Sequence, residues 1–334
     1  MLNDQNILVT GGTGSFGKRF VENILKRYNP TRLIIFSRDE LKQWEMRQTF
    51  SDKKYDCIRY FIGDVRDRER LYRAMDGVDI VVHAAALKQV PTAEYNPIEA
   101  VKTNVLGAAN LIDAAIDRNV KRVIALSTDK AAGPINLYGA TKLCSDKLLT
   151  AANSYSGRHH TRFAVVRYGN VVGSRGSVIP LFLKMKKTGV VPVTDPRMTR
   201  FWITLDQGVE FVLASLERME GGEIFVPKIP SMNMMDLARA IAPECRIEIV
   251  GIRPGEKLHE VMVPLGDGRN TLEFDDHYVI LHPFHEWGGR DDYHQTRGGI
   301  RCTEDFEFSS DKNTRWLTAE ALLEMASLQA GISA

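Results

Sequence analysis

Closely spaced cysteines are absent from this chain. Its 4 cysteines, Cys57, Cys144, Cys245 and Cys302, are widely scattered and form no Cys-x-x-Cys pair. This spacing excludes zinc sites built from cysteine pairs and argues against a disulfide framework. The histidines between residues 277 and 294 also lack the spacing of metal ligands. We therefore expect reduced thiols, no metal and a cytoplasmic protein.

Long apolar runs and blocks of like charge are absent too. No apolar stretch approaches the length of a membrane-spanning helix, and residues 1–6 lack the basic and apolar regions of a signal peptide. The 44 lysines and arginines nearly balance the 42 acidic residues, which gives a net charge of +2. We therefore expect neither a membrane nor a nucleic acid as a partner.

The first half does contain a regular alternation of short apolar runs and amphipathic stretches. The predicted strands are residues 7–10, 33–36, 58–62, 80–83, 123–126 and 163–166. The predicted helices between them are residues 15–28, 40–50, 67–75, 98–118 and 138–154. Asp67 suits an N-cap and Pro97 a first helical turn. Strands that alternate with helices predict an α/β fold with a doubly wound parallel sheet of the Rossmann type.

After about residue 170 prolines become frequent and the predicted elements become shorter. The predicted helices of this half are residues 206–219, 233–242 and 318–328. Residues 266–300 are rich in Gly, Asp and His and fit neither a helix nor a strand. We predict a cofactor-binding domain with the catalytic residues over 1–170. A smaller substrate-binding lobe, able to interleave with the first domain, is predicted over 171–334.

A glycine-rich segment joins the first predicted strand to the first predicted helix. Its glycines at positions 11, 14 and 17 permit a tight turn, close approach of the backbone to a pyrophosphate, and binding of that anion at the helix N-terminus. This context predicts a dinucleotide cofactor. The residues predicted to bind it here are Gly11, Thr13, Gly14, Ser15, Phe16 and Gly17.

The end of the second predicted strand bears on the choice between NAD and NADP. An NAD site usually has an acidic residue there for the ribose hydroxyls, but in this chain Ser37 and Arg38 come first. A guanidinium suits a 2′-phosphate, so we predict NADP. Asp39 follows and keeps NAD open, unless it caps the next helix. Further predicted cofactor contacts are Lys42, Asp64, Val65, Ala84, Ala85, Ala86 and Lys88.

A hydroxyl, an acid and a base stand next to a tyrosine and lysine pair. Tyr138 and Lys142 lie four residues apart, so one helix face carries both and the ammonium can lower the pKa of the phenol. Thr128, Asp129 and Lys130 directly follow the fifth predicted strand. Oxidation of an alcohol needs only the hydroxyl, tyrosine and lysine. The additional Asp129 and Lys130 predict a second acid–base step.

Together these motifs resemble the extended short-chain dehydrogenase/reductase family over almost the whole chain. The resemblance rests on Gly-x-x-Gly-x-x-Gly, on residues 83–86 (His-Ala-Ala-Ala), on a structural Asn104, and on Tyr-x-x-x-Lys. It implies that Tyr138 acts on a C4 hydroxyl of a sugar. It also implies that Lys142 binds the nicotinamide ribose and that Thr128 hydrogen-bonds the reacting oxygen. Members of the family often form dimers or larger rings, so we expect a homo-oligomer.

Within that family, Thr128-Asp129-Lys130 resembles the sugar-nucleotide 4,6-dehydratases. Lysine in place of glutamate is similar to the branch that acts on UDP-N-acetylglucosamine and inverts C5 in pseudaminic acid biosynthesis. The resemblance implies an NADP-dependent hydro-lyase in which Lys130 is the C5 base and Asp129 the acid for the C6 hydroxyl. A lysine that acts as a base must be neutral. Its pKa must then be lowered by burial or by a nearby cation such as Lys142.

The resemblance also implies contacts to a UDP-sugar substrate. Residues 174–180 resemble a loop that wraps the nucleotide, and Arg200 and Arg253 match positions whose guanidinium groups bind the diphosphate. Lys88 lies in the loop after the fourth predicted strand, at the edge of the sheet where ligands bind. The predicted substrate residues are Lys88, Thr128, Asn170, Val178, Arg200, Arg253 and Glu256.

Three other functions stay open at this point. A UDP-sugar 4-epimerase of the same fold would use Tyr138 and Lys142 but would not need Asp129 or Lys130. A dehydratase with added 5-epimerase activity for capsule sugars would share the Thr-Asp-Lys motif. A non-catalytic NADP sensor would usually lose the catalytic set, whereas Thr128, Tyr138 and Lys142 are all present here.

Overall fold

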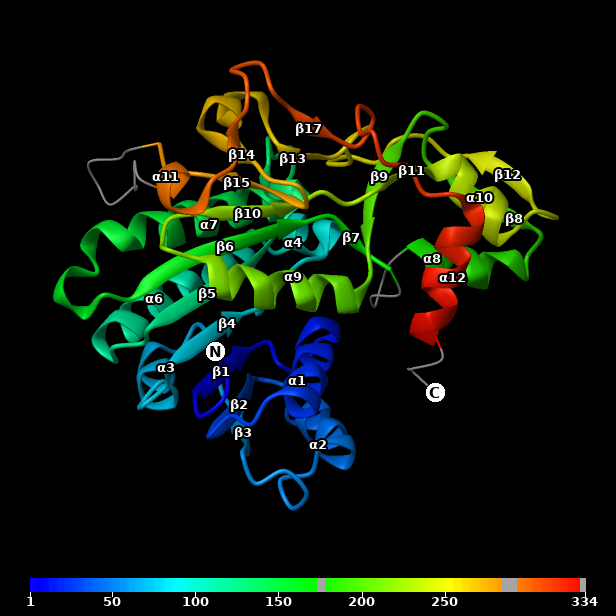
Figure 1. Cartoon of the computed structure of the whole chain (residues 1–334). Coiled ribbons are helices and arrows are strands. Elements are labelled where there is room, and N and C mark those ends of the chain that lie inside the picture. Colours follow the sequence, from blue (N-terminus) through cyan, green and yellow to red (C-terminus); the bar gives the residue numbers. More distant parts are fainter. Residues whose placement is uncertain (173–177, 284–292, 331–334) are drawn as a thin grey trace.

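A mixed sheet of ten strands runs through the computed structural model, which describes residues 1–172, 178–283 and 293–330 (Figure 1). The strand order is β16-β14-β15-β10-β6-β5-β4-β1-β2-β3. All neighbours from β10 to β3 pair in parallel, whereas β15, β14 and β16 are added by antiparallel pairing. The predicted α/β class with a doubly wound parallel sheet is therefore confirmed.

The strands of the first half lie where the apolar runs predicted them, with ends that differ by at most two residues. They are β1 (Asn6–Thr10), β2 (Arg32–Ser37), β3 (Ile58–Ile62), β4 (Ile80–His83), β5 (Arg122–Thr128) and β6 (Arg162–Tyr168). The apolar runs predict them well because the central strands are covered on both faces and most of their side chains are buried. The edge strand β3 is the exception, since only Ile58 of it is buried.

The helices between these strands also follow the amphipathic stretches. They are α1 (Ser15–Arg27), α2 (Glu40–Thr49), α3 (Arg68–Ala74), α5 (Pro97–Val101), α6 (Gly107–Asp117) and α7 (Leu137–Tyr155). Asp67 caps α3 and Pro97 begins α5, as predicted. The stretch expected as one helix over 98–118 is interrupted by a π-helical turn at Lys102–Leu106. The six-residue helix α4 (Val90–Tyr95) was not predicted, because it is too short to show a helical period.

The second half contributes both to the main sheet and to a separate layer. Its helices are α8 (Val178–Lys186), α9 (Leu205–Arg218), α10 (Met234–Ile241), α11 (Tyr293–Arg297) and α12 (Ala319–Ala330). Its longer strands are β8 (Val190–Val193), β9 (Thr199–Ile203), β10 (Ile224–Pro227), β12 (Arg246–Ile249) and β15 (His277–Ile280). Its shorter strands are β7 (Asn170–Val171), β11 (Ser231–Asn233), β13 (Val261–Val263), β14 (Thr271–Glu273), β16 (Ile300–Arg301) and β17 (Phe308–Ser309). Helices α9, α10 and α12 confirm the three helices predicted here.

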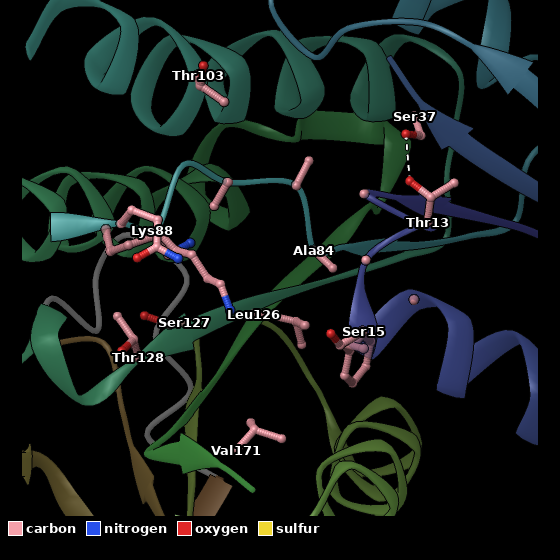
Figure 2. Close-up of a pocket in the computed structure, with 18 of the residues that line it drawn as sticks. Thr13, Ser15, Ser37, Ala84, Lys88, Thr103, Leu126, Ser127, Thr128 and Val171 are labelled. Atoms are coloured by element: carbon pink, nitrogen blue, oxygen red, sulfur yellow. Dashed lines mark hydrogen bonds between the residues drawn. The ribbon is translucent and has the colours of Figure 1, made fainter. Parts of the chain in front are cut away.

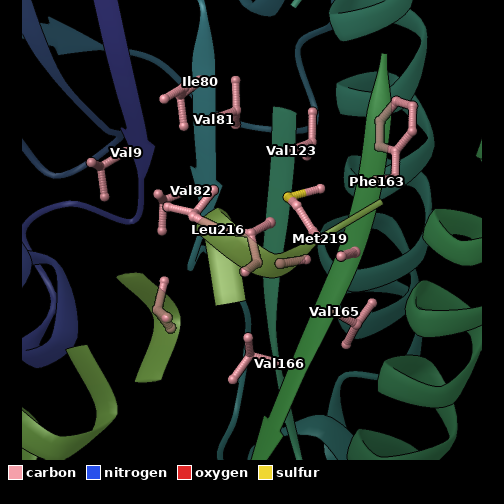
Figure 3. Packing of buried hydrophobic residues seen from close by; sticks show 14 of the residues in the cluster. Val9, Ile80, Val81, Val82, Val123, Phe163, Val165, Val166, Leu216 and Met219 are labelled. Atoms are coloured by element: carbon pink, nitrogen blue, oxygen red, sulfur yellow. The ribbon is translucent and has the colours of Figure 1, made fainter. Parts of the chain in front are cut away.

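Two large apolar cores, and a small third one of Ala93, Ala100 and Tyr138, hold the described elements together. In the larger core, Leu216 of α9 and the following Met219 pack with Val82, Val123 and Val165 of the sheet (Figure 3). This core continues into β10 and β15, so strands of the second half extend the sheet of the first. The second of the large cores surrounds Trp202 and joins α8, α10 and β8. The division at residue 170 and the interleaving of the two lobes stay predictions, and the second-half strands β10, β15, β14 and β16 extend the sheet at one end.

Candidate functional site

A pocket of about 750 Å³ lies at the carboxyl ends of the parallel strands (Figure 2). Residues that directly follow β1, β2, β4 and β5 line it, among them Gly11, Arg38, Ala84 and Lys130. The strand order reverses between β1 and β4, and a crevice at such a point is the usual ligand site of a doubly wound sheet.

The glycine segment forms one wall of the pocket and admits no side chain at two of its positions. Gly11 has a φ of +65°, and a Cβ there would lie 2.8 Å from the backbone nitrogen of Ala85. A Cβ on Gly17 would lie 2.4 Å from the carbonyl oxygen of Gly12. Helix α1 begins after Gly14, which has no side chain to cap it, so its first backbone N–H groups can bind a phosphate. This cradle fits the pyrophosphate of a nicotinamide dinucleotide.

The far end of the pocket carries the cations Arg38 and Lys42 and the acid Asp39, which already hydrogen-bonds within the protein. Asp39 is the N-cap of α2, and its Oδ1 accepts a hydrogen bond of 3.0 Å from the backbone nitrogen of Lys42. Hydrogen bonding with Lys42 lowers the pKa of Asp39. Arg38 is half exposed, with Nη1 3.6 Å from Asp64 Oδ2. The Ser37 hydroxyl lies 2.8 Å from that of Thr13, as Figure 2 shows. The helix-capping role considered for Asp39 is thus confirmed.

Asn104 fixes the loop after β4 against the helix that carries the tyrosine. Its Oδ1 accepts a hydrogen bond of 2.8 Å from the backbone nitrogen of Leu87, and its Nδ2 donates to the Leu87 carbonyl at 2.9 Å. The same Nδ2 donates to Thr141 on α7 at 3.0 Å. Lys88 follows in this loop, and its side chain extends into the pocket (Figure 2). Burial and the charge of Lys130 lower the pKa of Lys88.

Tyr138 and Lys142 lie in the pocket wall, both nearly fully buried. Burial raises the pKa of Tyr138 to about 12, although the charge of Lys130 and a hydrogen bond with Thr128 oppose this rise. The expected cation was Lys142, whereas Lys130 is the one that lowers the phenol pKa most. Lys142 is itself affected, because burial lowers its pKa and Asp146 opposes that change.

Lys130 lies between two buried carboxylates. Its Nζ is 3.0 Å from Asp129 Oδ1 and 3.2 Å from Glu260 Oε1, and a quarter of its side chain stays exposed to the pocket. Burial alone would lower the pKa of Lys130, but the two carboxylates outweigh burial and raise it. The expectation of a lowered lysine pKa is therefore wrong for this structure, because both Asp129 and Glu260 face Lys130, and no pattern in the sequence indicates the contact with Glu260.

Asp129 is fully buried, and the pKa of its carboxyl group is raised above the usual range. Burial, and then the negative charge of Glu260, raise the pKa of Asp129. Its Oδ1 accepts hydrogen bonds from Thr128 Oγ1 at 2.9 Å and from Lys130. Its Oδ2 has no hydrogen-bond partner among the described residues. A carboxyl group in this state can act as an acid.

A second buried network supports the helix face that carries Lys142. Asp146 lies one turn further along α7, and its Oδ2 accepts hydrogen bonds from Ser127 Oγ at 2.7 Å and from Arg167 Nη2 at 3.3 Å. Arg167 also donates to the carbonyl of Met262 at 2.9 Å, so the network joins β5, β6, α7 and β13. The spacing of four between Lys142 and Asp146 was a signal that could have found this acid.

Every residue predicted to contact the cofactor lines the pocket, and so do four of the predicted substrate residues. Those four are Lys88, Thr128, Asn170 and Val178. The lining residues that were not predicted are Phe36, Gly63, Gln89, Thr103, Leu126, Ser127, Tyr168, Gly169, Val171, Trp202 and Leu205. Most of them adjoin predicted strand ends, but no sequence signal placed Trp202 and Leu205 here. Residues 174–177 of the expected nucleotide loop lie outside the described residues.

The structure does not place the two expected diphosphate arginines in the pocket. Arg200 is buried, and its guanidinium donates to the carbonyls of Thr199, Leu258 and Lys257 at 2.7, 3.1 and 3.0 Å. Arg253 is mostly exposed and pairs with Glu256 at 3.9 Å, also outside the pocket wall. The assignment of Arg200, Arg253 and Glu256 to substrate contacts is not supported by this geometry. Arg200 instead holds the backbone that leads to Glu260.

Neither a metal cluster nor a membrane segment is found in the part of the chain that the structure describes. No group of three or more His, Cys, Asp and Glu side chains there is arranged to hold a metal ion. Among the same residues, every helix is too short or too polar to span a bilayer.

Comparison with known proteins extends these observations. Residues 7–282 match the family described as polysaccharide biosynthesis protein. The UDP-N-acetylglucosamine 4,6-dehydratase (inverting) of Campylobacter jejuni subsp. jejuni serotype O:2 is 55% identical over 331 residues, which cover 97% of this chain and 98% of that protein. The UDP-glucose 4-epimerase of Rickettsia canadensis is 44% identical over 290 residues, 84% of each chain. The X-ray structure of Pen from Bacillus thuringiensis is 37% identical, covers 99% of both chains and has a TM-score of 0.86.

Proposed function

The chain belongs to the polysaccharide biosynthesis protein family, and we propose that it is a UDP-N-acetylglucosamine 4,6-dehydratase that inverts C5. The observation that supports this most is that Thr128, Lys130 and Tyr138 line one end of a pocket whose other end is a glycine cradle. Asp129 is buried next to them, in contact with Thr128 and Lys130. The product would be UDP-2-acetamido-2,6-dideoxy-β-L-arabino-hex-4-ulose, as in the first step of pseudaminic acid biosynthesis.

The finer choice of cofactor is NADP. Asp39 is engaged as a helix cap, while Arg38 and Lys42 place two positive charges at the pocket end where the adenosine ribose of a Rossmann cofactor lies. A 2′-phosphate fits two cations better than a ribose diol does. Once bound, the nicotinamide supplies hydride transfer, away from C4 and later back to C6.

Tyr138 and Thr128 serve the oxidation at C4. Tyr138 Oη takes the proton of the C4 hydroxyl, and the positive charge of Lys130 favours the phenolate that does so. Thr128 lines the pocket next to it and can hydrogen-bond the same substrate oxygen. The resulting 4-ketone makes the C5 proton acidic.

Lys130 and Asp129 serve the loss of water. Lys130 keeps part of its side chain in the pocket, so it can reach the C5 proton as a base. Burial and Glu260 raise the pKa of Asp129, which makes its carboxyl group easier to protonate, and in the protonated form it can give that proton to the C6 hydroxyl as water leaves. A 4-epimerase would leave the C6 hydroxyl in place and would have no use for this pair.

Thr128 connects the two groups whose protonation changes in each cycle. Tyr138 ends the oxidation with one proton more, and Asp129 ends the elimination with one proton fewer. The Thr128 hydroxyl donates to Asp129 Oδ1 at 2.9 Å and also hydrogen-bonds the Tyr138 phenol. If Tyr138 gives its proton to the Thr128 oxygen and Thr128 gives its own proton to Asp129, then Asp129 is protonated again and the Tyr138 phenolate is restored.

The product formed from UDP-N-acetylglucosamine tests the proposal. We expect a 4-keto-6-deoxy sugar nucleotide with no net consumption of NADP or NADPH, because the hydride taken from C4 returns to C6. Proton NMR of the reaction in D₂O identifies the C6 methyl group and the configuration at C5. Formation of the C4 epimer alone would refute the dehydratase assignment. A product with retained C5 configuration would refute inversion.

Removal of the Arg38 side chain tests the choice of NADP. We expect Arg38→Ala to weaken NADP binding by about 10- to 100-fold, the equivalent of one charge-assisted hydrogen bond, and to leave NAD binding unchanged. Titration calorimetry of both cofactors measures this difference. Arg47→Ala is the matched control, since Arg47 lies on α2 near its other end, outside the pocket wall. Equal affinity of the Arg38 variant and the unmodified protein for NADP would contradict the prediction.

A further inference from the structure

Glu260 is a buried carboxylate that the chain brings to Lys130 from far along the sequence. It directly precedes β13, and only 2% of the residue is exposed. Its backbone is fixed on both sides by Ser310, whose Oγ accepts from the Glu260 nitrogen at 2.9 Å and whose nitrogen donates to the Glu260 carbonyl at 2.8 Å. The carboxylate therefore has a defined position, with Oε1 3.2 Å from Lys130 Nζ.

The surroundings of Glu260 favour its charged form. Arg200 Nε lies 3.7 Å from Oε1, and Arg200 is not part of the pocket wall. Burial would raise the pKa of Glu260, but Lys130, Arg200 and Lys257 outweigh burial and lower it. A buried carboxylate is costly unless it is paired, so its place beside Lys130 indicates a function of the pair. With Glu260 ionised, the proton rests on Lys130 between turnovers.

One oxygen of Glu260 is left without a partner. Oε2 is buried and makes no hydrogen bond with any described residue. The other carboxyl group at Lys130, that of Asp129, must keep its own proton for the C6 hydroxyl. Of the two carboxylates within ion-pair distance of Lys130, Glu260 is therefore the one that can accept a proton from it.

We propose that Glu260 is a positioning residue that holds Lys130 and stores its proton while Lys130 acts as the C5 base. This inference rests on the proposed dehydratase function. The proton moves from Lys130 Nζ to the Glu260 carboxylate across the 3.2 Å contact, which leaves a neutral amine and a neutral carboxyl group. The amine lone pair then takes the C5 proton, and the electron pair of the C5–H bond passes into the enolate of the 4-ketone.

The return steps restore both groups. Lys130 gives a proton back to C5 after C6 has been reduced, and Glu260 then returns its stored proton to the amine. A substrate that fills the pocket excludes water and so favours the neutral pair over two separated charges. The charged and titratable groups that face Glu260 are Asp129, Lys130, Arg200 and Lys257, and Lys130 also faces Lys88 and Tyr138.

Glu260→Gln tests the inference, because the amide keeps the shape of the side chain but cannot store a proton. In the variant, Lys130 can lose its proton only to solvent, because Asp129, 3.0 Å away, keeps its own proton for the C6 hydroxyl. We expect exchange of the C5 proton in D₂O to fall about 100-fold at neutral pH and to recover about tenfold per pH unit as the pH rises. Once the 4-ketone has formed, the unmodified protein exchanges the C5 proton at a rate that depends little on pH, since its proton moves internally. Formation of reduced nicotinamide, which reports C4 oxidation, stays within about threefold.

Two further variants complete the test. Glu260→Asp keeps an acceptor and should recover at least about a tenth of the exchange rate. Glu223→Gln is the control, because Glu223 is equally buried but caps the backbone of Glu220 and Gly221, outside the pocket wall. Exchange at the normal rate in Glu260→Gln, or an equal loss of oxidation and exchange at every pH, overturns the inference. If the unmodified protein releases no 4-keto-6-deoxy sugar, the proposed function fails instead.

Discussion

We expect Lys130→Met to abolish water loss, with a decrease of about 100- to 10,000-fold, while oxidation at C4 continues at a lower rate, because the charge that favours the Tyr138 phenolate is also lost. Methionine keeps the apolar stem of the side chain but has no group that can take the C5 proton. With a stoichiometric amount of enzyme, reduced nicotinamide should therefore accumulate and persist, and no C6 methyl signal should form. Absorbance of the reduced cofactor and proton NMR of the sugar measure the two steps separately.

The same substitution should also destabilise the fold. Lys130 is the cation between Asp129 and Glu260, so its loss leaves two buried carboxylates without their shared partner. Loss of one member of a buried ion pair costs about 3–5 kcal/mol, and denaturant unfolding measures it. Lys121→Met is the control, since Lys121 is an exposed lysine at the opposite end of β5. A Lys130→Met protein that still releases the dehydrated product would exclude Lys130 as the base.

We expect the second large effect from Tyr138→Phe, which acts on C4 oxidation, the step before water loss. Without the phenol oxygen, C4 oxidation should fall about 100- to 10,000-fold, and every later step falls with it. The reactive form of Tyr138 is the phenolate, and its pKa is raised to about 12. The oxidation rate of the unmodified protein should therefore increase with pH through the neutral range, whereas the variant should lose this dependence.

Single-turnover formation of reduced nicotinamide at several pH values checks this prediction. Tyr155→Phe is a suitable control, because Tyr155 ends the same helix and about half of it is exposed to solvent. The two variants Lys130→Met and Tyr138→Phe separate the steps, since only the second should prevent accumulation of the reduced cofactor. Oxidation at an unchanged rate in Tyr138→Phe would show that another group takes the C4 proton.

The residues at the cofactor end of the site could be predicted because each is identified by its immediate neighbours in the sequence. Each parallel strand is a short apolar run, and its carboxyl end must lie at the same sheet edge as the others. Residues that follow the strands, such as Gly11, Arg38, Asp64 and Ala84, therefore line one pocket whatever the details of packing. The tyrosine and the lysine of α7 reach it for the same reason, since that helix follows β5 directly.

The electrostatic state of the catalytic residues could not be predicted in this way. It depends on Glu260, which comes from a segment beside the three-residue strand β13 and shows no periodic pattern. The pKa of Lys130 was expected to be lowered, and this contact reverses the direction. Arg200 was misplaced for a related reason. A motif identifies the arginine, but only the packing of β9 against residues 257–260 shows that its donors are already engaged.

The role of Asp39 as the N-cap of α2 restricts the substitutions by which the cofactor preference of this site could change. The Asp39 carboxylate, which an NAD site would present to the ribose, is bound to the backbone nitrogen of Lys42. Freeing Asp39 for a ribose would leave α2 without its cap, at a cost of about 1 kcal/mol. A change from the proposed preference for NADP to one for NAD would therefore need at least two substitutions. One would supply an acid at position 37 or 38, and the other would remove the arginine. A single mutation at Asp39 would weaken the helix before it changed the cofactor.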